Sequence, residues 1–314
     1  MTGTWCTQEL KMAARKGYSI LRIHEVWHWP EKQRKTGLFA PYVNKFLKAK
    51  QEAGGWPSDC VTDQQKAEYV TEYEKYEGIL LDKEKIVVNP GRKAVAKLML
   101  NSFWGKFGEA DNKPTTSTIQ KVEDVTTVKK EGACAPNVKG NIFIPLFTTA
   151  LARLKLYEAL DVLKERVLYY DTDSVIYKSK PDDEKLPLGK FLGQFTDEIG
   201  GGFINEFGSA GPKSYSYRTN EGKTECKSKG LKNTHAVREV LNCNSMLNHI
   251  QLELKNPDEC KRQLKTILKN HFVRYSKVKS IHLEEMVKIF QVNWDKRIVE
   301  KGTGMTYPYG YVRL

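Results

Sequence analysis

The first 30 residues show two different spacings of apolar side chains. The apolar positions of Gln8–Lys16 follow a helical repeat, and Gly17 is suited to end that helix. Apolar and polar side chains then alternate along Tyr18–Trp29, which is typical of a strand with one buried face. The pattern therefore predicts a helix followed by a strand.

Three more helices are expected in the next part of the chain. Helical spacing covers residues 37–53 and, after a Gly-Gly-Trp-Pro break, Asp63–Leu81. The strongest helix signal comes after these two. Asn89 is a preferred N-cap and Pro90 fits the first helical position, so a helix is expected from there to about Phe107.

The middle of the chain mixes strand and helix signals. Residues 109–145 are rich in Thr, Val and Lys and predict short strands and loops, whereas Thr148–Leu163 has a helical pattern. Two short apolar runs, Arg166–Tyr170 and Ser174–Lys178, flank a tight turn and predict a hairpin.

The last third begins with a glycine-rich segment, residues 200–211, which predicts a flexible link. A second hairpin is expected from Tyr215–Thr219 and Lys223–Lys227, because Asn-Glu-Gly lies between them. From about His235 the pattern is mostly helical, and a tyrosine-rich strand, Tyr307–Tyr311, ends it.

Composition excludes several classes of protein. The chain has 314 residues, enough for two or three packed units, and its 40% hydrophobic and 28% charged residues are typical of a globular protein. No apolar run is long enough to span a membrane, and the N-terminus shows no signal peptide. Six scattered cysteines predict reduced thiols of an intracellular protein, and His24 and His28 lack the surroundings of a metal motif.

The net charge of +13 indicates a polyanionic partner, because neutralising phosphates releases counterions. Charge alone does not separate DNA, RNA and anionic membrane. No basic amphipathic helix with an aromatic face dominates the sequence, so nucleic acid is the favoured partner.

The helix that begins at Asn89 carries four polar and aromatic residues on one stripe. At 100° per residue, Lys97, Asn101 and Trp104 lie about 40°, 80° and 20° from Lys93. Lysines suit a triphosphate, and an aromatic ring suits a sugar and base. Gly105 leaves room for another backbone, and the apolar Val95, Leu98 and Met99 are expected to anchor the helix.

Asp171 and Asp173 occupy the turn of the first predicted hairpin, in Tyr169-Tyr170-Asp171-Thr172-Asp173-Ser174. Two carboxylates one residue apart on a rigid turn can hold Mg²⁺, which prefers carboxylates together with substrate phosphates. Phosphoryl transfer uses two such ions about 3.5–4 Å apart. A solvated turn is the alternative, since Asp-x-Asp by itself is a weak pattern.

Lys213 and Tyr215 follow in Gly211-Pro212-Lys213-Ser214-Tyr215. Residues two apart on a strand point to the same side. A lysine and an aromatic ring so placed can hold a phosphate of a nucleic-acid primer and pack against its sugar. Alternating Lys and Tyr in an ordinary hairpin is the structural alternative.

These strings resemble family B DNA polymerases. The run Lys97-Leu98-Met99-Leu100-Asn101-Ser102-Phe103-Trp104-Gly105 resembles motif B, K-x3-N-S-x-Y-G, and the Asp-Thr-Asp string resembles motif C. The Lys213-Ser214-Tyr215 segment resembles the K-x-Y motif that follows. The match is best to the protein-primed branch, which includes certain bacteriophage polymerases and those of Polinton/Maverick elements and related viruses.

The resemblance implies a role for each matched residue. Lys93, Lys97 and Asn101 are implied to bind the incoming dNTP, with Trp104 in place of the usual Tyr and therefore without its hydroxyl. Asp173 is implied to be the principal metal ligand and Asp171 the supporting carboxylate. Lys213 and Tyr215 are implied to hold the primer end.

The resemblance also implies an α+β polymerase right hand, present in part. Its expected division is the following: 1–30 palm; 31–108 fingers with an insertion; 109–145 a second insertion; 146–219 palm with the motif C hairpin; 220–314 thumb. The implied partners are DNA template-primer, dNTP and a terminal-protein primer. The implied location is intracellular, and nuclear or associated with a virus or mobile element in a eukaryote.

Motif A of the family is not found in the sequence. The string D-x-x-S-L-Y-P, which supplies another catalytic Asp, does not occur in residues 1–92. The exonuclease domain of the family is likewise expected to be absent. The resemblance therefore describes a C-terminal part of the enzyme with an incomplete two-metal site. The alternatives are a decayed or domesticated relic that binds DNA or nucleotide without catalysis, and an RNA-templated relative. Genomic sequence immediately upstream of Met1 separates the polymerase fragment from the relic, because an in-frame D-x-x-S-L-Y-P supports the fragment and stops or frameshifts support the relic.

The isolated 314-residue chain is predicted to have little or no polymerase activity. Losing one ligand of a two-metal site removes several orders of magnitude in rate. Single-turnover primer extension with Mg²⁺ measures this. Extension as fast as that of intact polymerases would contradict the prediction.

Overall fold

The fold is seen in a computed structural model, which describes residues 2–33, 35–109, 115–116, 127–128, 140–231, 234–263, 265–275, 280–294, 297–300 and 306–308. This part of the chain combines helices with small antiparallel sheets, as the α+β class requires. The chain divides into two compact units, Met1–Glu165 with Asp182–Phe195, and Arg166–Pro181 with Thr196–Leu314. The finer division into palm, fingers, insertions and thumb stays a prediction.

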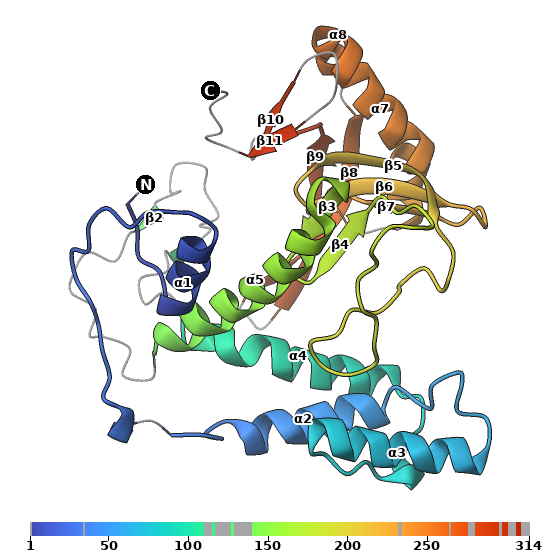
Figure 1. The fold of residues 1–314 in the computed structure, drawn as a ribbon. Coiled ribbons are helices and arrows are strands. Elements are labelled where there is room, and N and C mark those ends of the chain that lie inside the picture. The colour runs from blue at the N-terminus through green and yellow to red at the C-terminus, as the bar shows by residue number, and fades with distance from the viewer. Residues whose placement is uncertain are drawn as a thin grey trace. The chain divides into compact units, whose positions relative to one another are not determined.

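The first unit is mainly helical (Figure 1). Its elements in chain order are α1 (Thr7–Arg15), the 3-10 helix η1 (Glu31–Gln33), α2 (Ala40–Glu52), α3 (Asp63–Glu77), the 3-10 helix η2 (Lys83–Lys85), α4 (Pro90–Lys106), β1 (Thr115–Thr116), β2 (Thr127–Val128) and α5 (Phe143–Leu163).

The ends of α3 and the start of α4 follow their capping signals. Thr62 and Gln65 form a reciprocal capping box at the start of α3, and Gly78 ends that helix at φ 66°. Asn89 caps α4, because its side chain accepts a hydrogen bond of 2.9 Å from the Arg92 amide. The predicted helices at these positions are confirmed.

Helices α2 and α4 pack together through aromatic side chains. The rings of Tyr42 and Phe103 stack with centroids 4.3 Å apart, and the Tyr42 hydroxyl donates to the Met99 carbonyl at 3.1 Å. A second cluster buries the inner face of α3 against α2 and the segment before α4. Its members are Leu47, Tyr69, Val70, Tyr73, Ile79, Leu81 and Ile86.

The strand predicted over residues 18–29 is wrong. This segment forms no regular element, and its apolar side chains are largely exposed, with Leu21 at 95%. A strand requires a neighbouring backbone to complete its hydrogen bonds. No described segment pairs with residues 18–29, so the alternating pattern alone does not produce a strand here.

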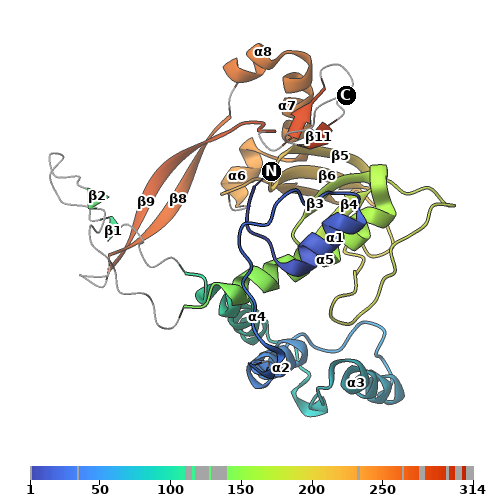
Figure 2. The same cartoon turned by 60° about the vertical axis from the view of Figure 1, so that its left-hand side comes forward.

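The second unit contains most of the strands (Figures 1 and 2). The 3-10 helix η4 (Lys164–Arg166) leads into it. Its elements are β3 (Val167–Asp171), β4 (Ser174–Tyr177), β5 (Ile204–Gly211), β6 (Ser214–Thr219), β7 (Thr224–Lys227), α6 (His235–Val240), α7 (Cys243–Lys255), α8 (Pro257–Arg262), β8 (Lys265–Tyr275), β9 (Ser280–Phe290), β10 (Arg297–Val299) and β11 (Thr306–Pro308).

Both predicted hairpins form, as β3–β4 and β6–β7. The flexible link predicted over residues 200–211 is wrong for most of its length, because β5 pairs with β6 and makes a three-stranded sheet β5-β6-β7. Gly208 has a packing role in that strand. A Cβ at this position would lie 2.5 Å from a methyl group of Leu247 on α7, so glycine lets the helix approach the sheet.

The helical prediction from His235 holds only as far as Arg262. Beyond it, β8 and β9 pair along their whole length as a long antiparallel hairpin, which extends as a two-stranded ribbon in Figure 2. Part of this ribbon joins the core of the second unit. The buried members of that core are Ala210, Val237, Leu241, Met246, Ile250, Ile267 and Phe290.

Other predictions meet the structure only in part. In residues 109–145, the two-residue strands β1 and β2 pair with each other, as short strands were expected there. Most of the remaining positions lie outside the described residues. The helix expected from Thr148 already begins at Phe143, as α5. The tyrosine-rich end is described only as β11, which pairs with β10. The five cysteines within the described part are free thiols. None of the helices described there has the length and apolar character to cross a bilayer.

Candidate active site

The turn between β3 and β4 holds both candidate metal ligands. Asp171 pairs with Ser174 across a two-residue loop, Thr172 and Asp173. The Asp173 amide donates to the Asp171 carbonyl at 2.6 Å, and Thr172 has φ 57°. A positive φ is rare for a β-branched residue, so the turn is held in a sparsely populated conformation, as is frequent at functional sites.

Hydrogen bonds within the turn orient Asp171. The Thr172 hydroxyl donates to its carboxylate at 3.0 Å, and the Ser174 hydroxyl donates to its carbonyl at 3.2 Å. The Asp171 side chain is 33% exposed, and Asp173 is exposed. The two carboxylates are therefore presented to solvent rather than buried in the unit.

The turn between β5 and β6 brings Lys213 to Asp171. Lys213 has φ 58°, and its ammonium Nζ lies 3.5 Å from Asp171 Oδ2. Its backbone amide donates to the Tyr169 hydroxyl at 3.0 Å. The β3–β4 pair and the β5-β6-β7 sheet are separate ladders within the described part, so this hydrogen bond is a direct polar link between them.

Aromatic packing strengthens the same link. The rings of Tyr169 and Tyr215 lie 4.9 Å apart, and Tyr215 stacks on Tyr217 at 6.3 Å. The Lys227 ammonium lies 5.5 Å from the Tyr215 ring, and a hydrogen bond to Tyr215 raises the pKa of Lys227. Lys213 belongs to the turn and Tyr215 to β6, yet both meet Tyr169. The structure thus brings Asp171, Lys213 and Tyr215 together.

The Tyr169 hydroxyl stays protonated in this environment. Burial raises its pKa above the usual value, the Lys213 amide acts in the opposite direction, and the Asp171 carboxylate raises it further. A neutral hydroxyl can accept a hydrogen bond from the Lys213 amide while it keeps its own proton.

The donor set at the turn fits Mg²⁺. This ion is usually bound through one or two carboxylates and completes its shell with water and substrate phosphate. Asp171 and Asp173 supply two carboxylates on one short turn. Within the described residues no group of three or more His, Cys, Asp or Glu side chains forms a metal cluster.

Helix α4 carries the candidate nucleotide residues in the first unit. Lys93, Lys97 and Asn101 are exposed, and Trp104 is half-buried. A Cβ at Gly105 would meet no described atom within 4 Å, so the expected close approach of another backbone is not seen among the described residues.

The expected anchors of α4 are partly wrong. Val95 and Leu98 are 59% and 63% exposed, whereas Ala96 is buried and Phe103 stacks on α2. The face of α4 that is buried thus depends on its contacts with α2, and the spacing of apolar residues within one helix does not predict those contacts.

Lys50 of α2 joins the lysines of α4, and the sequence did not single it out. Burial and then the ammonium groups of Lys97 and Lys93 lower its pKa below the usual value. Lys93 also reaches the end of α2, since its Nζ would lie 3.6 Å from a Cβ on Gly54. No periodicity within a single helix predicts such a cluster, because its members come from two helices.

Comparison of the chain with protein-family models, with curated proteins and with solved structures found no match in any of the three.

Replacing Tyr169 with Phe tests the link between the two turns. The variant leaves the Lys213 amide without its hydroxyl acceptor, which typically lowers stability by about 1 kcal/mol. Amide hydrogen exchange at Lys213 is expected to accelerate. Tyr170→Phe is the matched control, because this neighbouring ring is 44% exposed. Equal exchange at Lys213 in all three proteins would show that the hydrogen bond does not hold the turn.

Proposed function

We propose that this chain carries the motif C and nucleotide-binding parts of a family B DNA polymerase. The activity proposed is template-directed DNA synthesis, by nucleotidyl transfer from a dNTP to a primer 3′-hydroxyl. The observation that carries the proposal is the meeting of Asp171 with Lys213 at 3.5 Å, with Tyr169 bonded to the Lys213 amide. Motifs that are far apart in the chain and resemble polymerase motifs thus meet at one place.

Asp171 and Asp173 are the residues proposed to hold Mg²⁺. When bound, the metal would lower the charge barrier to attack on the α-phosphate and stabilise the leaving pyrophosphate. The turn contributes by orienting the carboxylates, since Thr172 and Ser174 bond to Asp171. The motif A carboxylate of the family is not among residues 1–92.

Lys213 and Tyr215 are proposed to hold the primer end. The Lys213 side chain is 64% exposed, so its ion pair with Asp171 is worth little and is readily exchanged for a primer phosphate. Tyr215 is partly exposed, and contacts with Tyr169 and Tyr217 position its ring, so that the exposed part can pack against a sugar.

Lys50, Lys93 and Lys97 are proposed to neutralise the triphosphate of the incoming nucleotide. The ammonium groups of Lys97 and Lys93 are close enough to Lys50 to contribute, after burial, to its lowered pKa. A bound phosphate would relieve the repulsion among these three ammonium groups, so the site favours a polyanion. Asn101 and Trp104 lie farther along the same helix and would face the sugar and base.

Binding of primer-template DNA by the full chain tests this proposal. Affinity is expected to fall steeply with salt, and Lys213→Ala should weaken binding and lower the slope of log K against log salt by about 1. Lys223→Ala is the matched control, since Lys223 lies at the other hairpin turn of the same sheet and also pairs with a carboxylate, Glu221.

Two results would count against the DNA site. One is affinity that does not change with salt, and the other is an equal loss in the Lys213 and Lys223 variants. A relic that only binds DNA is separated by nucleotide selection. The polymerase proposal expects the dNTP complementary to the template to stabilise the complex more than a mismatched dNTP, whereas a relic would show no preference.

A further inference from the structure

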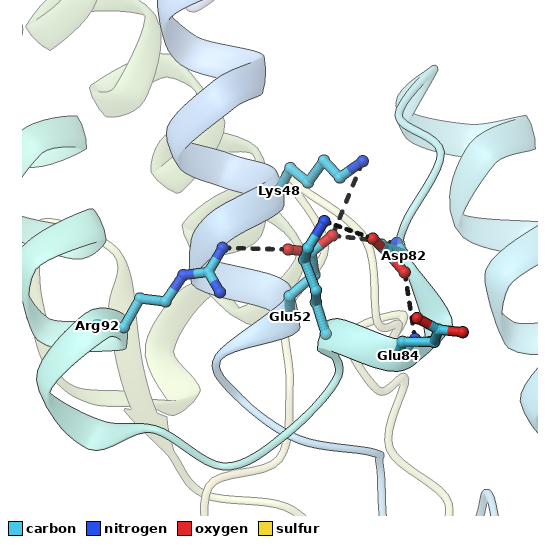
Figure 3. Close-up of polar contacts among 6 residues, drawn as sticks. Lys48, Glu52, Asp82, Glu84 and Arg92 are labelled. Carbon is cyan, nitrogen blue, oxygen red and sulfur yellow. Dashed lines mark hydrogen bonds and ion pairs between the residues drawn. The ribbon is translucent and has the colours of Figure 1, made fainter.

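Glu52 is a carboxylate at the end of α2 that is almost fully buried, with 1% of its surface exposed. An ionised group in the interior is unfavourable unless charges and hydrogen bonds compensate it. Glu52 has three such partners, which converge on its two oxygens from three elements (Figure 3).

The partners come from α2, from α4 and from the segment between α3 and α4. Arg92 of α4 places Nη2 3.4 Å from Oε2, and Lys48 of α2 places Nζ 3.8 Å from Oε1. The Asp82 amide donates to Oε1 at 3.0 Å. Arg92 and Lys48 are 46% and 40% exposed, so water already solvates both cations, and the carboxylate is the group that depends on the contact.

Backbone hydrogen bonds also connect the end of α2 to the segment that leads into α4. The Val87 amide donates to the Glu52 carbonyl at 3.1 Å, and the Asn89 amide donates to the Ala53 carbonyl at 3.0 Å. Asn89 is also the N-cap of α4. The end of α2 and the start of α4 are therefore held by both main-chain and side-chain contacts centred on Glu52.

This junction lies directly beside the lysine cluster. Lys50 lies two residues before Glu52 on α2, and Lys93 follows Arg92 directly on α4. Three ammonium groups repel one another, so some other interaction has to keep their helices in register. The contacts of Glu52 therefore join α2 and α4 close to the positions of Lys50 and Lys93.

We propose that Glu52 is a positioning residue that holds Lys50 beside Lys93 and Lys97 and thereby preforms a cationic site for a nucleoside triphosphate. The inference rests on the proposed function for its ligand. Whether Glu52 holds Lys50 beside Lys93 concerns only α2 and α4 and can be tested without the nucleotide.

The sign of the effect distinguishes positioning from simple electrostatics. Glu52→Gln removes a negative charge near a cationic site while its amide oxygen can still accept from Asp82. If the charge acted only through its field, triphosphate binding would tighten. If Glu52 positions the lysines, binding weakens by about tenfold, the lower end of the loss produced when a side chain that orients a metal ligand is removed.

Two measurements on the full chain test the inference. The first is the Kd for dTTP in buffer without divalent metal, where the carboxylate turn has no metal to contribute. The second is the yield of the Lys50–Lys93 cross-link with a short amine-reactive reagent, quantified by mass spectrometry. Glu74→Gln is the control, because it removes the same charge from an exposed position on α3.

The expected result is that Glu52→Gln weakens dTTP binding and reduces the cross-link, while Glu74→Gln changes neither. An undiminished cross-link, with or without a change in affinity, would overturn the positioning role. If the unaltered chain does not bind dTTP but its cross-link still depends on Glu52, the nucleotide site of the proposed function fails and the positioning role is supported. Should Glu52→Gln not fold, Arg92→Gln breaks the same pair from its solvated side. Because this variant removes a positive charge, weaker dTTP binding is expected from the field alone, and the cross-link yield is the readout that decides: a fall supports the positioning role and an undiminished yield overturns it.

Discussion

The hydrogen bond from the Lys213 amide to the Tyr169 hydroxyl is the contact on which the candidate active site depends. It joins strand β3, which leads into the carboxylate turn, to the turn between β5 and β6. Each of these turns holds a non-glycine residue at positive φ, Thr172 at 57° and Lys213 at 58°. Each such conformation is unfavourable by roughly 1–3 kcal/mol and persists only when its surroundings hold it. The packing of Tyr169 on Tyr215 supplies part of that support and places Lys213 at Asp171.

Charge organises the two units in different ways. At the carboxylate turn, Asp171 meets one solvated lysine, a weak pairing that a stronger phosphate ligand can replace. In the first unit, positive charge predominates locally, since Lys50, Lys93 and Lys97 lie near one another. The buried Glu52 contacts both helices that carry these lysines. We propose that the first arrangement serves a metal ion and the second a polyanion, in a chain whose net charge is +13.

Local signals in the sequence predicted the elements whose ends and pairing are encoded nearby. The Asn89 cap and the hairpin around Asp171 formed as expected, and the helix expected from Asp63 begins there, with a capping box at Thr62. Contacts between distant segments were not predictable in this way. The segment 18–29 alternates like a strand but has no described neighbour to pair with, and the long β8–β9 hairpin overrode a helical pattern. Lys50 was missed because its partners lie on another helix.

The most direct test of the account is photocross-linking from the 3′-terminal nucleotide of a primer annealed to its template. With a photoreactive thymine at that position, cross-links are expected to the peptides that contain Tyr169–Asp173 and Lys213–Tyr215, with a reduced yield after Lys213→Ala. Cross-links confined to other surfaces, or an equal yield from the internal phosphate backbone and the 3′ end, would contradict the assignment of these two turns to the primer terminus.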